Sequence, residues 1–196
     1  MKSLILATQN LGKLQEIRHM LGPEVAVTSL ADLSGAPQIV EDGGTFEANA
    51  VKKARVVARH ANRPALADDS GLEVDALGGA PGVFSARYAG ENASDSENNA
   101  RLVEQLGGVP KEKRTARFRC VIAVATPDGA VRTVEGQCEG RILTVSRGLN
   151  GFGYDPLFLV PELGRTFAEL SSKEKNRLSH RGQALRAART ILQEIL

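Results

Sequence analysis

The sequence has few of the residues that build disulfide frameworks or large aromatic cores. Its 196 residues include no tryptophan, two cysteines and only 4% aromatic side chains. Two cysteines do not make a disulfide framework in a chain of this size, and Cys120 and Cys138 lack the spacing of metal ligands. We therefore interpret both as small buried apolar residues in a reducing cytoplasm.

Long apolar runs and a surplus of one charge are also missing. No segment approaches the roughly 20 apolar residues that span a membrane, and the opening stretch, MKSLILA, turns polar too soon for a signal peptide. The 25 basic and 23 acidic residues leave a net charge of +2, which argues against binding nucleic acid through a broad basic field. We expect a cytoplasmic protein with neither a membrane nor a nucleic-acid partner.

Apolar strand patterns and amphipathic helix patterns alternate along the chain, which predicts a single α/β domain with a core built from its 42% hydrophobic residues. Pro127-Asp128-Gly129-Ala130 separates two strand patterns and predicts a hairpin, so we expect the sheet to be mixed. Strands are predicted at 3–7, 25–29, 117–126, 131–137, 141–145 and 157–160. Helices are predicted at 13–21, 46–61, 94–106 and from Ser179 to Ile195.

One stretch places two acids side by side. Asp68 and Asp69 follow a short apolar run and precede Ser70-Gly71. Adjacent carboxylates raise each other's pKa and destabilise a fold unless a cation or a proton resolves the conflict. A solvated acidic turn is the ordinary interpretation of this pattern, and a divalent metal site is the alternative.

Several basic residues stand at positions where the pattern allows two interpretations. Lys53 lies on the apolar side of helix 46–61, where its ammonium could reach water or point into a cleft. His180 and Arg181 open the last helix, where the helix dipole disfavours cations. They are either an exposed pair or donors to an anionic or carbonyl-bearing ligand.

Other segments suit a phosphate ester. Residues 8–13 join a strand to a helix, a turn that directs backbone N–H groups at an anion, although it is neither a Walker A loop nor GxGxxG. The carboxylates of Glu41, Asp68 and Asp69 are donors suited to Mg²⁺. Glycines on both sides of Phe152 allow a flat ligand to approach its ring. The cations that could balance a polyphosphate are Lys13, Lys53, Lys175 and Arg181.

Most of these residues, though not Glu41 or Lys175, belong to segments spread over nearly the whole chain. They are TQNLGK (8–13), Thr45-Phe46 with Asn49-Ala50 and Lys53-Ala54, ADDSG (67–71), GGAPGVFSAR (78–87), GFGYDP (151–156) and SHRG (179–182). In content and order they resemble the inosine triphosphate pyrophosphatase family. The resemblance implies a Mg²⁺-dependent hydrolase that cuts ITP, dITP and XTP to the nucleoside monophosphate and pyrophosphate. It also implies an elongated mixed sheet flanked by helices, two closely joined lobes with a central substrate cleft, and a homodimer.

The resemblance assigns roles by position. Glu41 and Asp69 would bind Mg²⁺, and Asp69 would also orient or deprotonate the attacking water with support from Asp68. The phosphates and the sugar would be held by Thr8, Gln9, Asn10, Leu11, Gly12, Lys13 and Lys53, with Ser70 as a further contact. The base pocket would consist of Phe152, Gly153, Tyr154, Asp155, Lys175, His180 and Arg181, with Phe152 stacked on the purine.

Two other functions compete with this one. A Maf-like nucleotide pyrophosphatase acting on pyrimidine or modified nucleotides would share a related fold and the first lysine loop, but SHRG and GFGYDP argue against it. A non-catalytic nucleotide sensor would not need Asp68, Asp69 and Lys53. Release of pyrophosphate from a panel of nucleotides distinguishes the three functions.

Overall fold

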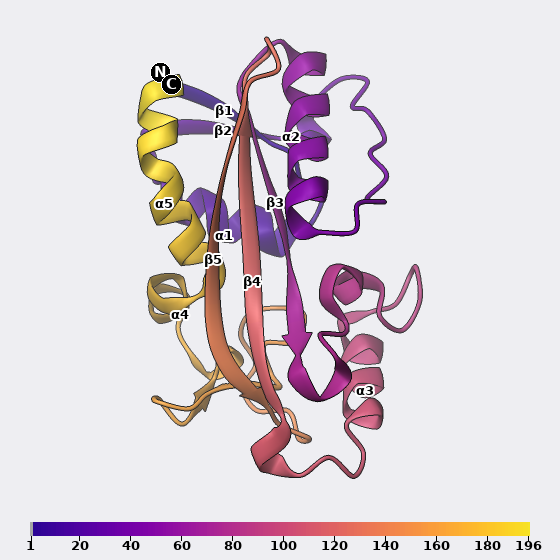
Figure 1. Cartoon of the computed structure of the whole chain (residues 1–196). Helices are drawn as coiled ribbons and strands as arrows, with labels where there is room; N and C mark the ends of the chain where they lie inside the picture. Colours follow the sequence, from indigo (N-terminus) through magenta and orange to yellow (C-terminus); the bar gives the residue numbers. More distant parts are fainter. Residues whose placement is uncertain (1) are drawn as a thin grey trace. The chain divides into compact units, whose positions relative to one another are not determined.

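The computed structural model describes residues 2–196, with the backbone alone for Lys2, so Met1, the first residue of the stretch judged against a signal peptide, lies outside it. Its sheet has the strand order β2-β1-β3-β4-β5-β6-β7. β1 runs parallel to β2 and β3, whereas β6 is antiparallel to β5 and β7, which confirms the mixed α/β sheet (Figure 1). The strands are β1 (Lys2–Leu6), β2 (Val25–Ser29), β3 (Ala65–Val74), β4 (Thr115–Ala125), β5 (Val131–Ile142), β6 (Phe158–Val160) and β7 (Arg165–Thr166).

The helices begin where the sequence supplies caps. Thr45, Ser94 and Ser171 each accept a hydrogen bond from the backbone N–H three residues later, and the last two complete capping boxes. The helices are α1 (Leu11–Leu21), α2 (Phe46–Ala61), α3 (Asp95–Gln105), α4 (Ser172–Leu178) and α5 (His180–Ile195). None of these helices in the described part of the chain is long and apolar enough to cross a membrane.

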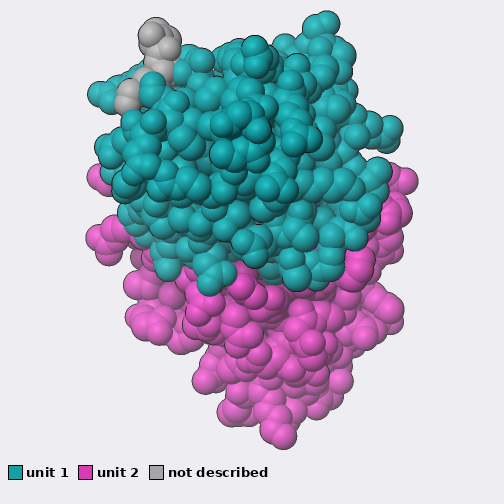
Figure 2. Space-filling model, turned by 45° about the horizontal axis from the view of Figure 1, so that its top comes forward, with its two compact units in different colours: residues 1–69, 120–136, 181–196 teal, residues 70–119, 137–180 magenta. Residues whose placement is uncertain are grey.

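The chain divides into two compact units, coloured teal and magenta in Figure 2. Unit 1 contains residues 1–69, 120–136 and 181–196, and unit 2 contains residues 70–119 and 137–180. β3, β4 and β5 each contribute one part to unit 1 and the other part to unit 2. The two units are therefore described separately below.

Unit 1 has a helical layer on each face of its strands. α1 and α5 pack against one face, where their apolar side chains join Leu4, Leu6 and Leu66 in one buried cluster. α2 lies on the opposite side of the strands from α5 (Figure 1) and buries Ala50, Ala54 and Val57. Because successive strand residues project to opposite faces, each strand of this unit contributes side chains to both layers.

Unit 2 concentrates the scarce aromatic residues in one core. The ring of Phe118 lies 4.7 Å from that of Phe158 and 5.7 Å from that of Phe167, measured between centroids. Tyr154 belongs to the same buried cluster, and its hydroxyl donates to the Ser85 carbonyl at 2.8 Å. Ser85 lies in the GGAPGVFSAR segment, and its own hydroxyl accepts from the Leu72 backbone N–H at 2.9 Å. This segment therefore ties β3 to the aromatic core.

The expected ends of two strand patterns are wrong. β3 runs without interruption from Ala65 to Val74, so Asp68 and Asp69 lie inside a strand rather than in a solvated turn. The strand expected at residues 141–145 is not separate, because β5 continues to Ile142 and there pairs with Phe158 of β6. In both places tertiary contacts extend a strand beyond the point where local polarity or glycine predicts its end.

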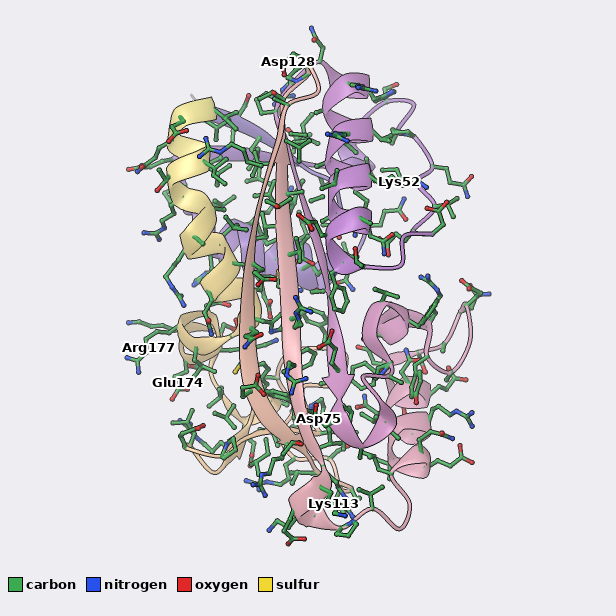
Figure 3. All side chains as sticks on the ribbon, in the orientation of Figure 1. Lys52, Asp75, Lys113, Asp128, Glu174 and Arg177 are labelled. Carbon is green, nitrogen blue, oxygen red and sulfur yellow. The ribbon has the colours of Figure 1, made fainter. Side chains whose placement is uncertain are left out.

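The cap of α4 provides a test of its stability. The Glu174 carboxylate accepts from the Ser171 backbone N–H at 2.9 Å and from Arg165 at 2.8 Å, and Figure 3 shows Glu174 on this helix. The Ser171 backbone N–H, Arg165 and the Ser171 hydroxyl lower the pKa of Glu174 from 4.5 to about 2. Since the pKa is lower in the folded state, the stabilisation is present above pH 4.5 and is lost as the pH falls through about 2.

We therefore predict that Glu174→Gln lowers the urea midpoint at pH 6 and that the difference from the parent protein shrinks as the pH approaches the pKa of the folded state. Equilibrium unfolding across this pH range measures the effect. Glu162→Gln, which removes an exposed carboxylate outside the helix caps, is the control. A difference between Glu174→Gln and the parent that does not change with pH would contradict the prediction.

Candidate active site

Asp68 and Asp69 are neighbours in sequence but meet different layers of unit 1. They are 1% and 5% exposed, and as consecutive residues of β3 they project to opposite faces of the sheet. Asp68 meets side chains of α1 and α5, whereas Asp69 meets side chains of α2. The alternation of the strand therefore resolves the conflict between the two charges without a proton shared by the two carboxylates.

Asp68 lies in a dense set of donors. Lys13 approaches its Oδ1 at 2.6 Å, and Arg181 Nε donates to Oδ2 at 2.9 Å. The Cys120 thiol also donates to Oδ2, at 3.0 Å. Although burial opposes ionisation, Arg181 and Lys13 hold the pKa of Asp68 well below its usual range. Burial and the nearby Asp68 carboxylate raise the pKa of the Cys120 thiol well above its usual range, so the thiol keeps the proton that it donates.

Arg181 is the largest fully buried side chain of the described chain and has a second carboxylate partner. Its Nη1 donates to Glu16 of α1 at 2.6 Å, while its Nε holds Asp68. The interpretation of His180 and Arg181 as an exposed pair is therefore wrong. In unit 2, His180 is also buried, and its ring stacks on Phe118 with centroids 4.7 Å apart.

Asp69 shares one ammonium with Glu41. Lys53 Nζ contacts Asp69 Oδ1 at 2.8 Å and Glu41 Oε1 at 2.7 Å, and it donates to the Asp68 carbonyl at 2.8 Å. Although burial opposes protonation of the amine, Asp69 and Glu41 raise the pKa of Lys53 above its ordinary value. Burial also raises the pKa of Asp69, because it outweighs the opposing effects of Lys53 and Lys13.

The two neighbouring lysines of α2 have opposite environments. Lys52 points away from the sheet (Figure 3) and pairs with Asp42 at 2.6 Å, with 40% of its side chain exposed. Lys53, one residue later, is 6% exposed and reaches the two carboxylates. Of the two interpretations of Lys53, the geometry therefore supports the ammonium directed inward rather than toward water.

The carboxylates of Glu41 and Asp69 suit a hard cation. Both contact the same nitrogen of Lys53, so their oxygens converge on one point of unit 1. Mg²⁺ takes one or two protein carboxylates and completes its shell with water and substrate phosphate. Among residues 2–196 no three His, Cys, Asp or Glu side chains are grouped to hold a metal ion. The donor set therefore fits an ion shared with a phosphate ligand better than one enclosed by protein.

The segment from Thr8 to Lys13 forms the start of α1. Asn10 caps the helix by accepting from the Lys13 N–H at 3.0 Å, and the Thr8 hydroxyl accepts from the Asn10 N–H at 3.2 Å. Gln9 and Leu11 are exposed, and Gly12 is half-buried. Lys13 is the member of this segment that joins the carboxylate cluster, through Asp68. Because Asn10 caps the helix, α1 begins two residues earlier than predicted.

In unit 2, Asp155 organises the GFGYDP loop. It is 2% exposed, accepts from the Phe152 N–H at 2.9 Å and pairs with Lys175 of α4. The Lys175 ammonium also lies 4.9 Å from the Phe152 ring centroid. Gly151 has a φ of +76°, and a Cβ there would stand 1.9 Å from Asp155 Oδ2, so this position admits only glycine. Phe152, Asp155 and Lys175 therefore form one preorganised group.

Tyr154 and Ser70, also predicted to contact a ligand, lie outside these two groups of residues. The Tyr154 side chain is buried in the core of unit 2 and hydrogen-bonded to Ser85, so it anchors the loop to that core. Ser70 is half-buried on β3, one residue after Asp69. Their roles toward a ligand stay predictions.

Three residues of the carboxylate cluster were assigned no role from the sequence. Asn49 is 1% exposed, donates to Asp69 Oδ2 at 3.3 Å and accepts from the Gly43 N–H at 2.8 Å. It lies one helical turn before Lys53, a spacing that could have identified it. Glu16 lies three residues after Lys13 on α1, which is a similar signal. Cys120 is on β4 and offers no local signal.

Comparison with known proteins identifies the family of the chain. Residues 4–191 match the model of the Ham1 family. The chain is 55% identical to a dITP/XTP pyrophosphatase of Desulforamulus reducens, covering 98% of this chain and 96% of that protein. It is 56% identical to one of Geobacter sulfurreducens, covering 94% of each. The solved structure of a HAM1 protein from Coxiella burnetii has a TM-score of 0.88 and 46% identity, covering 99% of this chain and 100% of that one.

The two α2 lysines make a matched pair for testing the site. We predict that Lys53→Met lowers the free energy of unfolding by about 3–5 kcal/mol, because it leaves Asp69 and Glu41 without their shared cation. Lys52→Met should change it by less than about 1 kcal/mol, since Lys52 forms an exposed pair. Urea unfolding of both variants measures the difference. Equal losses would show that the Lys53 contacts do not hold the carboxylates.

Proposed function

Because the chain belongs to the Ham1 family, we propose that it hydrolyses deaminated purine nucleoside triphosphates, dITP, ITP and XTP, to the nucleoside monophosphate and pyrophosphate. The observation that carries the proposal is the convergence of Glu41 and Asp69 on the buried ammonium of Lys53. The curated relatives named as dITP/XTP pyrophosphatases supply the substrate class.

In this proposal residues of unit 1 bind the phosphates. Glu41 and Asp69 hold Mg²⁺, which would neutralise triphosphate charge. Lys13 and Lys53 supply fixed positive charge for phosphate oxygens, and Asp69 orients or deprotonates the attacking water. Asp68 holds the Lys13 and Arg181 side chains in place. Phosphoryl chemistry of this kind depends mainly on positioning and charge stabilisation.

Residues of unit 2 bind the base. The Phe152 ring stacks on the purine, and Lys175, fixed by Asp155, donates toward the 6-oxo group of hypoxanthine or xanthine. Adenine presents an amino group there, which leaves the donor unpaired. Sites built to hydrogen-bond one group reject an analogue that lacks it by about 10⁴-fold or more.

We also propose the cofactor, the oligomeric state and the location of the protein. Mg²⁺ is the cofactor, the working form is a homodimer, and the cytoplasm, where nucleotides are made and used, is the location. Neither nucleic acid nor a membrane is a partner.

A nucleotide panel tests the activity. The protein is incubated with Mg²⁺ and ITP, XTP, GTP, ATP or dTTP, and released pyrophosphate is measured. We expect rapid release from ITP and XTP and slow release from ATP and dTTP. Preferred release from dTTP would instead support the Maf-like function, and no release from any nucleotide would support the sensor.

A second prediction concerns the catalytic carboxylate. Asp69→Asn should lower kcat/KM for ITP by at least about 10³-fold, because the amide neither binds Mg²⁺ strongly nor accepts a proton. Asp75→Asn is the control, since Asp75 follows the same strand but pairs with Thr115 and Arg117 (Figure 3). Circular dichroism checks that both variants are folded. Near-normal hydrolysis by folded Asp69→Asn would refute its role.

A further inference from the structure

Helix α3 contacts the GFGYDP loop of unit 2 through the backbone of one residue, Gly153. Asp95 Oδ2 accepts from the Gly153 N–H at 2.6 Å. Asn99, one turn along the same helix, donates through Nδ2 to the Gly153 carbonyl at 2.8 Å. The same amide donates to the Asp95 carbonyl at 2.7 Å, which ties the two residues together. Both polar groups of Gly153, the residue after Phe152, are therefore bonded to α3.

The rest of the loop is anchored elsewhere. The N–H groups of Leu149 and Asn150 donate to the Ala168 carbonyl at 3.1 and 3.0 Å, and the Asn150 side chain donates to Leu170 at 3.0 Å. These bonds hold the start of the loop against residues 164–170. The contacts from α3 act on the other side of Phe152, so they bear directly on the orientation of its ring.

Helix α3 is a rigid support for this contact. Its N-terminus carries a complete capping box between Ser94 and Glu97, and Leu102 is fully buried in the core of unit 2. Asn98, on another side of the helix, bonds the backbone of Ala86 and Ala89 at 3.1 and 2.8 Å. The helix is thereby fixed independently of the loop.

Packing does not replace the polar contacts at this place. A cavity of about 820 Å³ lies between α3 and the loop, and Asn99, Ala100, Val103 and residues 148–153 line it. Gly153 has no side chain, and a Cβ built on it would have no neighbour within 4 Å. The orientation of the loop toward α3 therefore depends on the bonds from Asp95 and Asn99.

We propose that Asp95 and Asn99 are positioning residues that fix the two peptide groups flanking Gly153 and thereby preorganise Phe152 for stacking on the purine. The inference rests on the proposed function of unit 2 in base binding. Neither residue belongs to the segments that carry the family resemblance. They act on Phe152 through the loop.

The test uses Asp95→Ala, which removes the acceptor, and Asn99→Ala, which removes the donor without adding a charge. Asp95→Asn restores an acceptor oxygen and is the conservative rescue. Ser96→Ala, an exposed neighbour on α3 that makes no bond to Gly153, is the control. The measurements are kcat and KM for ITP, inhibition by inorganic tripolyphosphate, and amide hydrogen exchange at residues 151–155.

We expect Asp95→Ala and Asn99→Ala each to raise KM about fivefold, the effect of losing one net hydrogen bond to Gly153, with kcat changed less than about twofold. Tripolyphosphate has no base, so its inhibition constant should not change. The Gly153 amide should exchange faster in Asp95→Ala. Asp95→Asn and Ser96→Ala should behave like the parent protein.

Hydrogen exchange at Gly153 tests the positioning role of Asp95 independently of the proposed function. If the parent protein releases no pyrophosphate from any nucleotide, the proposed function fails, whereas unchanged Gly153 exchange in Asp95→Ala refutes the positioning role whatever the activity. Faster exchange with an unchanged KM would refute the link to base binding. An equal weakening of ITP and tripolyphosphate would indicate general loosening and would also overturn the inference.

Discussion

The structure of unit 1 depends on the burial of two adjacent carboxylates on β3. Two neighbouring charges in a strand interior would be strongly destabilising if they shared one environment. Strand geometry sends them to opposite faces, and each face supplies its own cation. Asp68 meets Lys13 and Arg181 beneath α1 and α5, while Asp69 meets Lys53 of α2. The two helical layers are thus joined through β3 by electrostatics as well as by apolar packing.

This arrangement gives the two carboxylates different chemical roles. Asp68 is saturated by two cations and a thiol and serves to hold side chains in place. Asp69 shares a single ammonium with Glu41, and its second oxygen has a longer contact of 3.3 Å with Asn49. It is therefore the carboxylate better able to accept a metal ion or a water. This division agrees with the roles that the family resemblance implies.

Local signals in the sequence predicted much of the fold. Thr45 and Ser94 mark the starts of α2 and α3 at the expected residues, because a cap requires only a side chain and a backbone N–H three residues away. The hairpin at Pro127–Ala130 is likewise local, with the Thr126 N–H donating to the Ala130 carbonyl. The continuation of β3 through Asp68 and Asp69 was not predictable in this way, since their counter-charges come from three different helices, α1, α2 and α5.

The candidate site shows the same limit. Helical spacing placed Lys53 on the inner side of α2 but could not say whether its ammonium finds water or carboxylates. Arg181 was expected from the dipole argument to be either exposed or ligand-bound, and its burial against Asp68 and Glu16 depends on the pairing of α5 with α1. The resemblance to a known family assigned roles to most residues of the cluster but not to Asn49, Glu16 or Cys120, and the contacts emerged only from the folded chain.

The division between Asp68 and Asp69 can be measured by urea unfolding of Asp68→Asn and Asp69→Asn side by side. Asp68→Asn removes the carboxylate that Lys13 and Arg181 share and leaves Arg181 with Glu16 alone, whereas in Asp69→Asn Lys53 keeps Glu41 and the Asp68 carbonyl. This division predicts that the free energy of unfolding falls by about 3–5 kcal/mol in Asp68→Asn and by clearly less in Asp69→Asn. Equal losses, or a larger loss for Asp69→Asn, would contradict it.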